Sequence, residues 1–420
     1  MNLNSRTELV MPAGTLDKLK FACAYGANAV YAGMPKFSLR ARTNSFREEQ
    51  LAEGIDYAHE RGVKVYLTLN IFAHNNRVEP SLQALGSLMR LEPDAVIMSD
   101  PGLIMFARQE FPDLEIHLST QSNTMNWAAV QFWKNQGIQR VILPRELSIR
   151  EIRGIHEQVP DIDLEVFVHG AMCISYSGRC LLSSYMSSHR DANLGVCTNS
   201  CRWEYRLCEG AADVVLEERN RPGKYFPIEE DQHGTYIMNS KDLCAVTLLQ
   251  ELTDAGVESF KIEGRTKSVY YLANIGRAYR RALDRIEAGE AFDPEVLNDV
   301  YATASRGYTT GFLIDAREES RQNYEHGYSL YSRYKFAGRV TSYDPKSGRA
   351  EVEVKNRFQV GDMIEFISPA DSFCQEIREM FDPDGEPIQV AHGGGAVITV
   401  AVEQEPEPFT LLRMPLEDDN

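Results

Sequence analysis

A cluster of cysteines in the middle of the chain is the strongest chemical signal in this 420-residue sequence. Five of the eight cysteines fall within 36 residues, and these are Cys173, Cys180, Cys197, Cys201 and Cys208. The first four have the spacing C-x6-C-x16-C-x3-C, and four thiolates can fill either a tetrahedral zinc site or a cubane iron–sulfur cluster. The spacing therefore predicts a metal centre and leaves both metals open.

The spacing lacks two familiar signatures, the paired C-x2-C knuckles of zinc sites and the C-x3-C-x2-C motif of radical-SAM enzymes. Loops of unequal length favour a cluster held by a lid over a larger domain. Cys208 and Cys244 compete with Cys201 for the fourth ligand position. Cys23 and Cys374 are expected to pack as small hydrophobic residues, and packing without any metal is the alternative for the whole cluster.

The scaffold that must position this segment is a repeated alternation of short apolar runs and amphipathic stretches. Thr15 is placed to cap the first helix, and glycines such as Gly26 and Gly256 follow helical stretches, as left-handed helix ends require. The apolar runs are residues 9–11, 29–32, 63–69, 95–98, 116–118, 141–143, 164–168 and 259–262. Eight such units predict a TIM-like (β/α)8 barrel. A doubly wound parallel sheet is the alternative, but no Gly-rich dinucleotide-binding turn follows the first run.

Two stretches depart from this alternation. Residues 171–235 hold the cysteines and a charged segment, which predicts an insertion in the barrel. From Tyr331 onward the chain alternates polar and apolar residues between turn signals, as in residues 338–354, which predicts a small antiparallel β-barrel. The predicted domains are a barrel over residues 1–330 and a C-terminal domain over residues 331–420.

Residues 165–183, EVFVHGAMCISYSGRCLLS, resemble the signature of the collagenase-like peptidase family U32. The resemblance extends through residues 11–14 (MPAG), 99–102 (SDPG), 198–205 (TNSCRWEY) and 261–268 (KIEGRTKS). Together with the C-terminal domain, these segments are similar to the branch of the family that hydroxylates the wobble uridine of tRNA. Relatives that hydroxylate ubiquinone precursors lack that domain, so its presence favours the RNA branch.

This resemblance implies an oxygen-independent 5-hydroxylation with prephenate, a dicarboxylate, as co-substrate. It implies a [4Fe–4S] cluster on Cys173, Cys180, Cys197 and Cys201, with zinc as the alternative metal. The implied partner is the tRNA anticodon loop.

Polar residues directly after the predicted strands should line the barrel mouth, where (β/α)8 barrels carry their active sites. Arginines bind carboxylates bidentately, so Arg145 and Arg265, with Arg40 and Arg42, are candidates for holding a dicarboxylate. The alternative for each is an ordinary surface arginine. Gln121 is a further, weaker candidate for substrate contact.

Three more residues at strand ends are candidates for catalysis. His169 directly precedes the cysteine segment, where it would carry a proton or bond to cluster or substrate, and a structural histidine is the alternative. Glu263 beside Lys261 would act as a general acid or base, or else form an ion pair that braces the strand end.

Two surfaces combine basic and aromatic residues in the way that single-stranded RNA favours. One is the junction at residues 306–308 and 324–336, and the alternative there is that its aromatic side chains pack the small domain onto the barrel. The other is Arg202 and Trp203 beside the cysteines.

Composition limits the remaining possibilities. Forty-four basic against 61 acidic residues give a net charge of −17, which excludes general coating of nucleic acid but not a local basic patch. No apolar run approaches the roughly 20 residues that span a bilayer, and the first residues lack a signal-peptide pattern, so we expect a cytoplasmic protein, with a homo-oligomer or a partner subunit open. The competing functions are a peptidase, although H-E-x-x-H and G-x-S-x-G are missing, and a zinc-stapled scaffold without chemistry.

Overall fold

A computed structural model describes residues 7–33, 46–172, 241–303, 305, 307–314 and 332–416. Between residues 215 and 236 it describes the backbone of four short strands, β8 (Val215–Glu217), β9 (Tyr225–Pro227), β10 (Glu229–Asp231) and β11 (Gly234–Tyr236). The predicted ligands Cys173, Cys180, Cys197 and Cys201 lie outside the described residues, as do Cys208, Arg40, Arg42, Arg202 and Trp203.

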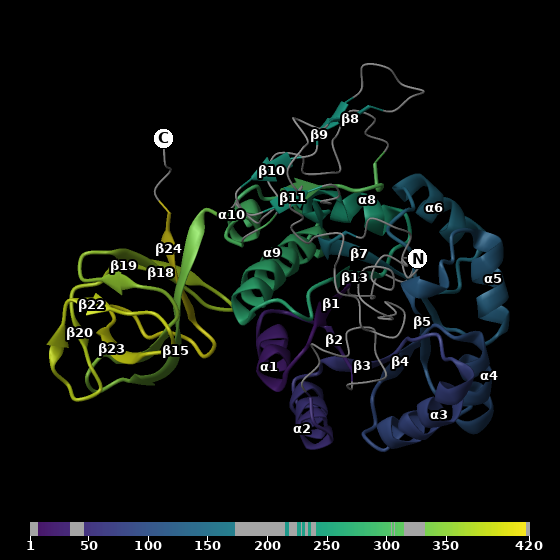
Figure 1. The fold of residues 1–420 in the computed structure, drawn as a ribbon, viewed down its shortest axis with the longest axis horizontal. Helices are drawn as coiled ribbons and strands as arrows, with labels where there is room; N and C mark the ends of the chain where they lie inside the picture. The colour runs from purple at the N-terminus through teal and green to yellow at the C-terminus, as the bar shows by residue number, and fades with distance from the viewer. Residues whose placement is uncertain are drawn as a thin grey trace, which may run out of the picture.

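Eight parallel strands close into a barrel, which confirms the predicted (β/α)8 fold (Figure 1). The closing strand pairs with the first strand on one side and the seventh on the other, so an open doubly wound sheet is excluded. The strands are β1 (Glu8–Pro12), β2 (Ala29–Ala32), β3 (Lys64–Leu69), β4 (Ala95–Met98), β5 (Ile116–Leu118), β6 (Arg140–Ile142), β7 (Asp163–Ala171) and β13 (Ser259–Ile262).

Helices surround this barrel and begin and end at the predicted signals. The Thr15 hydroxyl accepts a hydrogen bond from the Lys18 amide at 3.2 Å. Gly256 has a φ of +89°, and a Cβ there would lie 2.2 Å from the His156 ring, so only glycine fits. The helices are α1 (Leu16–Ala24), α2 (Glu48–His59), α3 (Asn75–Met89), α4 (Pro101–Glu110), α5 (Trp127–Asn135), α6 (Ile149–Gln158), α8 (Leu249–Asp254), α9 (Val269–Glu287) and α10 (Val296–Tyr301), with single turns at Thr120–Ser122 and Val246–Leu248.

Strand β7 runs past the barrel and pairs there with β12 (Asp242–Cys244). Strand β12 pairs in turn with β14 (Tyr308–Thr309). The antiparallel register sets Ala171 opposite Asp242 and His169 opposite Cys244. Because residues 173–240 lie between these two strands in sequence, both ends of the cysteine segment are fixed beside the carboxyl end of β7.

The C-terminal residues form a separate antiparallel domain around its own apolar core, as the alternation predicts. Its main sheet has the order β19-β18-β24-β15-β16-β23-β20-β21. Cys374 is exposed on this sheet, so the expectation that it packs inside is wrong. The strands are β15 (Tyr334–Asp344), β16 (Arg349–Val354), β17 (Phe358–Gln359), β18 (Met363–Ile367), β19 (Ser372–Glu376), β20 (Met380–Phe381), β21 (Pro387–Ile388), β22 (Val390–Ala391), β23 (Val397–Ala401) and β24 (Leu411–Pro415).

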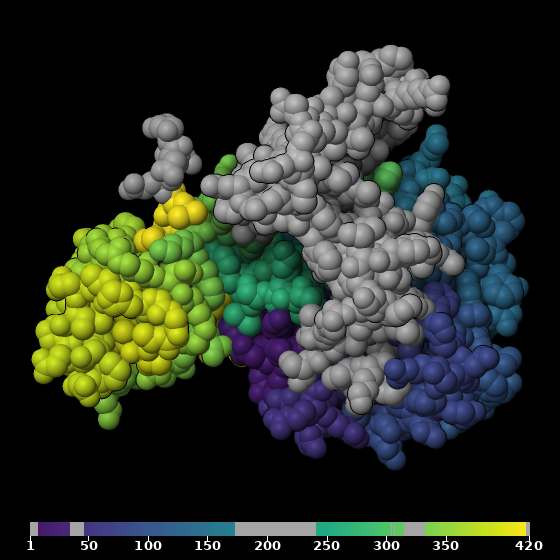
Figure 2. All heavy atoms as spheres, viewed as in Figure 1, coloured from purple at the N-terminus to yellow at the C-terminus, as the bar shows by residue number. Residues whose placement is uncertain are grey.

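The C-terminal domain forms a lobe beside the barrel and packs on α1 and α9 (Figure 2). Phe336 stacks on Tyr270 of α9 with ring centres 4.6 Å apart. Tyr334 lies under the Arg413 guanidinium at 4.4 Å. The packing interpretation is therefore right for Tyr334 and Phe336, two of the aromatic residues that the RNA interpretation also used.

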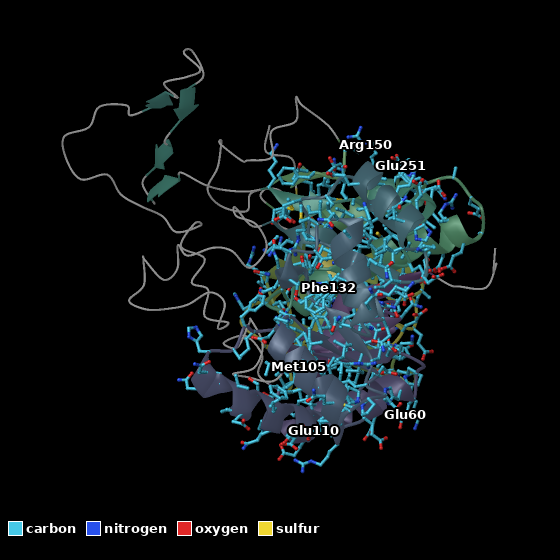
Figure 3. The ribbon with its side chains drawn as sticks, turned by 90° about the vertical axis from the view of Figure 1, so that its right-hand side faces the viewer. Glu60, Met105, Glu110, Phe132, Arg150 and Glu251 are labelled. Carbon is cyan, nitrogen blue, oxygen red and sulfur yellow. The ribbon has the colours of Figure 1, made fainter. Side chains whose placement is uncertain are left out.

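On the side of the barrel away from this lobe, α4 and α5 expose apolar side chains. Met105 and Phe132 are 51% and 55% exposed, and both are labelled in Figure 3. Among the helices that the structure describes, none is both long enough and apolar enough to cross a membrane.

Candidate active site at the barrel mouth

Polar side chains lie together at the carboxyl ends of the barrel strands, directly after the apolar residues of each strand. Most of them are buried, with exposed fractions of 8% for Asn70 and Gln121, 1% for His169 and 5% for Arg265. A closed parallel barrel brings all strand ends of one polarity to one rim, so residues distant in sequence become neighbours.

Arg145 and Glu263, from the loops after β6 and β13, form an ion pair at this rim. The guanidinium donates from Nη2 to Glu263 Oε2 at 3.2 Å and lies 3.6 Å above the Phe167 ring. Arg145 Nε is buried and has no hydrogen-bond partner among the residues that the structure describes. One face of this arginine is thus held by protein, while a further N–H remains to bind an anion.

Arg265 lies on the same rim. Its Nη1 donates to Thr68 Oγ1 at 3.1 Å, and its guanidinium is 5.7 Å from the centre of the Tyr31 ring. The Tyr31 hydroxyl donates to the Ile262 carbonyl at 3.0 Å, which fixes that ring against β13. The structure therefore places the two predicted carboxylate-binding arginines at strand ends of one barrel, with Lys261 beneath them.

Lys261 is fully inside the barrel and pairs with a residue that sequence reasoning missed. Its Nζ donates to Glu165 Oε1 at 2.6 Å and lies 4.3 Å over the Tyr31 ring. Burial lowers the pKa of Lys261, and Glu165 opposes that shift. The expected ion pair between Lys261 and Glu263 is wrong in its partner: Lys261 pairs with Glu165, and Glu263 pairs with Arg145.

Below Lys261 the charges continue toward the amino ends of the strands. Glu165 also faces Arg140 Nη1 at 3.4 Å and accepts from Ser259 Oγ at 3.2 Å, and Arg140 pairs with Glu8 as well. Among the described side chains of this column that are mostly buried, the cations are Arg140, Arg145, Lys261 and Arg265, and the carboxylates are Glu8, Glu165 and Glu263. Two more exposed partners, Asp163 of Arg140 and Lys64 of Glu8, add one charge of each sign. One positive charge is in excess, so the described interior suits an anionic ligand. The signal for Glu165 was in the sequence, because a charged residue inside a buried apolar run needs a buried partner.

His169 lies in β7 within a group of tyrosines. Its Nδ1 is 3.2 Å from the Tyr279 hydroxyl, and the rings of Tyr271 and Tyr308 are 5.9 and 5.3 Å away. Burial lowers the pKa of His169 to about 3, so the imidazole is neutral. Within the described ranges, its Nε2 has no hydrogen-bond partner.

Cys244 is the cysteine that the structure places closest to the ends of the undescribed segment. It lies opposite His169 in the β7–β12 pairing, with its Sγ 3.9 Å from the Tyr279 hydroxyl. Cys23, in contrast, packs against the barrel core from α1, as expected. The described residues contain no group of three or more His, Cys, Asp or Glu side chains that could hold a metal, so the metal centre stays a prediction.

Two other polar residues of the rim have different roles. Gln121 is buried, and its Oε1 has no hydrogen-bond partner among the described side chains and backbone, so these leave it available to a ligand. Asp100 caps α4 by accepting from the amides of Gly102 and Leu103 at 2.8 and 3.1 Å, which makes it structural.

Fold and site together define a two-domain protein with a (β/α)8 barrel, a cation-rich barrel mouth and an antiparallel domain fixed to its side. Residues 14–323 match the model of peptidase family U32, and residues 332–413 match that of the peptidase family U32 C-terminal domain. The chain belongs to peptidase family U32, which confirms the resemblance.

Several curated relatives carry names related to RNA hydroxylation. The tRNA hydroxylation protein P of Escherichia coli is 46% identical over 96% of this chain and 95% of its own. The tRNA hydroxylation protein P1 of Bacillus subtilis is 37% identical over 98% of this chain and 95% of its own. A 23S rRNA 5-hydroxycytidine synthase of Escherichia coli is 34% identical over 75% of this chain but only 44% of its own length.

Proposed function

We propose that this protein is a tRNA-modifying enzyme that hydroxylates C5 of the wobble uridine without molecular oxygen. The observation that carries the proposal is the 46% identity to tRNA hydroxylation protein P of Escherichia coli, which extends through both domains. The rRNA relative supports the position of the modification, because its name places a hydroxyl group at C5 of a pyrimidine.

The barrel mouth supports a dicarboxylate such as prephenate as co-substrate. Arg145 and Arg265 stand at strand ends above Lys261, and the described interior has one positive charge in excess. Planar guanidinium groups bind carboxylates with two parallel hydrogen bonds, and two of them fix the orientation of a ligand with two carboxylates. Glu263 would hold Arg145 in place until the ligand binds.

The proposed cofactor is a [4Fe–4S] cluster on Cys173, Cys180, Cys197 and Cys201, with Cys244 as the alternative to Cys201 and zinc as the alternative metal. The fit is supported by the β7–β12 pairing, which fixes both ends of the cysteine segment at the barrel mouth next to His169. A bound iron–sulfur cluster would supply electron-transfer or Lewis-acid chemistry there. The chain itself orients the dicarboxylate with Arg145 and Arg265 and excludes water from His169, which is 1% exposed.

The test is nucleoside mass spectrometry of tRNA from a deletion strain grown without oxygen, so that no oxygen-dependent route contributes. The strain is complemented with the wild-type gene, with Cys180→Ser, or with Cys23→Ser as the matched cysteine control. We expect 5-hydroxyuridine derivatives to be lost on deletion and restored by wild type and Cys23→Ser only. An unchanged nucleoside profile in the deletion strain would reject the tRNA function and leave the peptidase and scaffold alternatives to be tested.

A further inference from the structure

The hydroxyl group of Tyr279 determines which nitrogen of His169 carries the proton. This hydroxyl has one proton to donate and two lone pairs to accept with. Its shortest contact is with the Val168 carbonyl oxygen, at 2.7 Å. Two oxygens this close need a proton between them, so the hydroxyl donates to Val168.

Two nitrogens lie within 3.2 Å of the Tyr279 oxygen, while Cys244 Sγ is farther away, at 3.9 Å. Because the hydroxyl proton is already used, each nitrogen can bond to this oxygen only as a donor. The Ala245 amide, which can only donate, occupies one lone pair at 3.2 Å. His169 Nδ1, also at 3.2 Å, faces the other, and it can bond there only if it carries a proton. A charged ring is costly at 1% exposure, so the ring is neutral and a proton on Nδ1 leaves Nε2 as a bare lone pair.

The surroundings of Nε2 indicate that its lone pair binds a ligand. The ring is 1% exposed, and Nε2 has no hydrogen-bond partner among the described residues, although a buried acceptor of this kind is costly when unpaired. His169 also lies in the strand that leads directly into the cysteine segment, opposite Cys244. Tyr279 thus fixes the proton on Nδ1, and Nε2 is left as a hydrogen-bond acceptor.

We propose that Tyr279 is a positioning residue that holds His169 as the Nδ1–H tautomer, so that Nε2 accepts a hydrogen bond from a donor group of the bound substrate. The role of Nε2 toward the substrate rests on the proposed function. The tautomer restricts that role to accepting a hydrogen bond. A hydrogen bond donated by His169 Nε2 to a cluster or a substrate is then excluded.

The tautomer is tested in the purified protein by NMR of ¹⁵N-labelled histidine, with His169→Asn identifying the signals of residue 169. We expect Nδ1 to be protonated and Nε2 not. Tyr279→Phe should shift the population toward Nε2–H, because it removes the acceptor of the Nδ1 proton. Tyr271→Phe is the matched control: it removes another buried hydroxyl, which bonds to the Glu263 carbonyl at 2.8 Å and not to His169, so the tautomer should not change. A protonated Nε2 in the wild type, or an unchanged tautomer in Tyr279→Phe, would overturn the assignment.

The acceptor role is tested with His169→Asn, whose side-chain amide can still donate toward Tyr279 but has nothing in place of Nε2. We expect tRNA 5-hydroxyuridine to fall at least tenfold while iron per protein stays at the wild-type level. A loss of iron would instead mean that Nε2 binds the metal, and unchanged hydroxyuridine would mean that Nε2 is not used; either result rejects the acceptor role. If the wild type makes no hydroxyuridine, the proposed function fails, but the NMR result still decides the tautomer.

Discussion

Two buried polar clusters of this molecule use the same residue types and are built differently. Between the domains, Arg413 donates to both oxygens of Glu365 at 2.9 Å and pairs with Asp299 at 3.0 Å, while Arg277 faces Asp299 at 3.4 Å. These two cations and two carboxylates are balanced. At the barrel mouth the described cations exceed the carboxylates, and Arg145 Nε and His169 Nε2 have no hydrogen-bond partner in the part of the chain that the structure describes.

The difference indicates what each cluster is for. In the interdomain cluster, Arg277 Nε and Asp299 Oδ2 make no hydrogen bond among the described residues, but these opposite charges face each other at 3.4 Å. A balanced cluster of this kind holds two surfaces together and leaves no net charge to bind a ligand. A cluster with excess charge and an unpaired buried acceptor is less favourable in the free protein and is completed by a ligand. We therefore expect substitutions between the domains to change stability, and substitutions at the mouth to change function.

The largest effect on stability is expected from Arg413→Met. It leaves Asp299 and Glu365 as buried carboxylates without their shared cation, which lowers the free energy of unfolding by about 3–5 kcal/mol. Urea unfolding followed by tyrosine and tryptophan fluorescence measures the change. The control is Arg378→Met, whose partner Glu403 is 3.1 Å away across an exposed pair, for which we expect about 0–1 kcal/mol. Equal effects of the two substitutions would contradict the structural role of the interdomain cluster.

Lys261→Met is expected to cost less, about 2–3 kcal/mol, since Arg140 still faces Glu165. Burial alone would raise the pKa of Glu165, but Lys261 and Arg140 outweigh it and lower the pKa. The ionised carboxylate therefore stabilises the fold above its ordinary pKa, and this contribution is lost as the pH falls through the lowered value.

Without Lys261 the pKa of Glu165 rises, so acid unfolding should begin at a higher pH than in wild type. Circular dichroism during an acid titration measures the midpoint. An unchanged midpoint would show that Lys261 does not stabilise the Glu165 carboxylate.

Arg145→Met should separate function from stability. It removes a mostly buried ion pair with Glu263 that has a single hydrogen bond, for which we expect a loss of about 1.5–3 kcal/mol. We also expect at least a tenfold loss of tRNA 5-hydroxyuridine in the complementation assay. The same urea assay used for Arg413→Met gives the comparison. A stability loss as large as that of Arg413→Met would mean that the barrel mouth, like the interdomain cluster, serves mainly to stabilise the fold.

The sequence alone predicted the barrel and the residues at its carboxyl rim, but few of their contacts. The eight apolar runs correspond to the eight strands, because burial on both faces leaves an uninterrupted apolar signal. Strand ends then identify Arg145 and Arg265. The partner of Lys261 could not be predicted from strand ends, because the register between β7 and β13 decides whether Glu165 or Glu263 faces it. Tyr279 was missed because it is 110 residues from His169 and looks like a core residue of α9.

The smallest effect is expected at the amino end of the barrel, where Glu258 lies beside Asp163. Burial, with the neighbouring Asp163 carboxylate, raises the pKa of Glu258 to about 7. The folded protein therefore binds a proton that the unfolded chain has released, and stability falls as the pH rises from the ordinary value toward 7. Glu258→Gln should reduce the loss of unfolding free energy between about pH 5.5 and about pH 8, by less than about 1 kcal/mol because the side chain is exposed, and melting temperatures at the two pH values report the change. Glu251→Gln, at an exposed glutamate on α8 labelled in Figure 3, is the control and should keep the wild-type loss. If Glu258→Gln also keeps the wild-type loss, Glu258 and Asp163 do not share a proton. The charges at this end of the barrel would then be satisfied, as they are in the interdomain cluster.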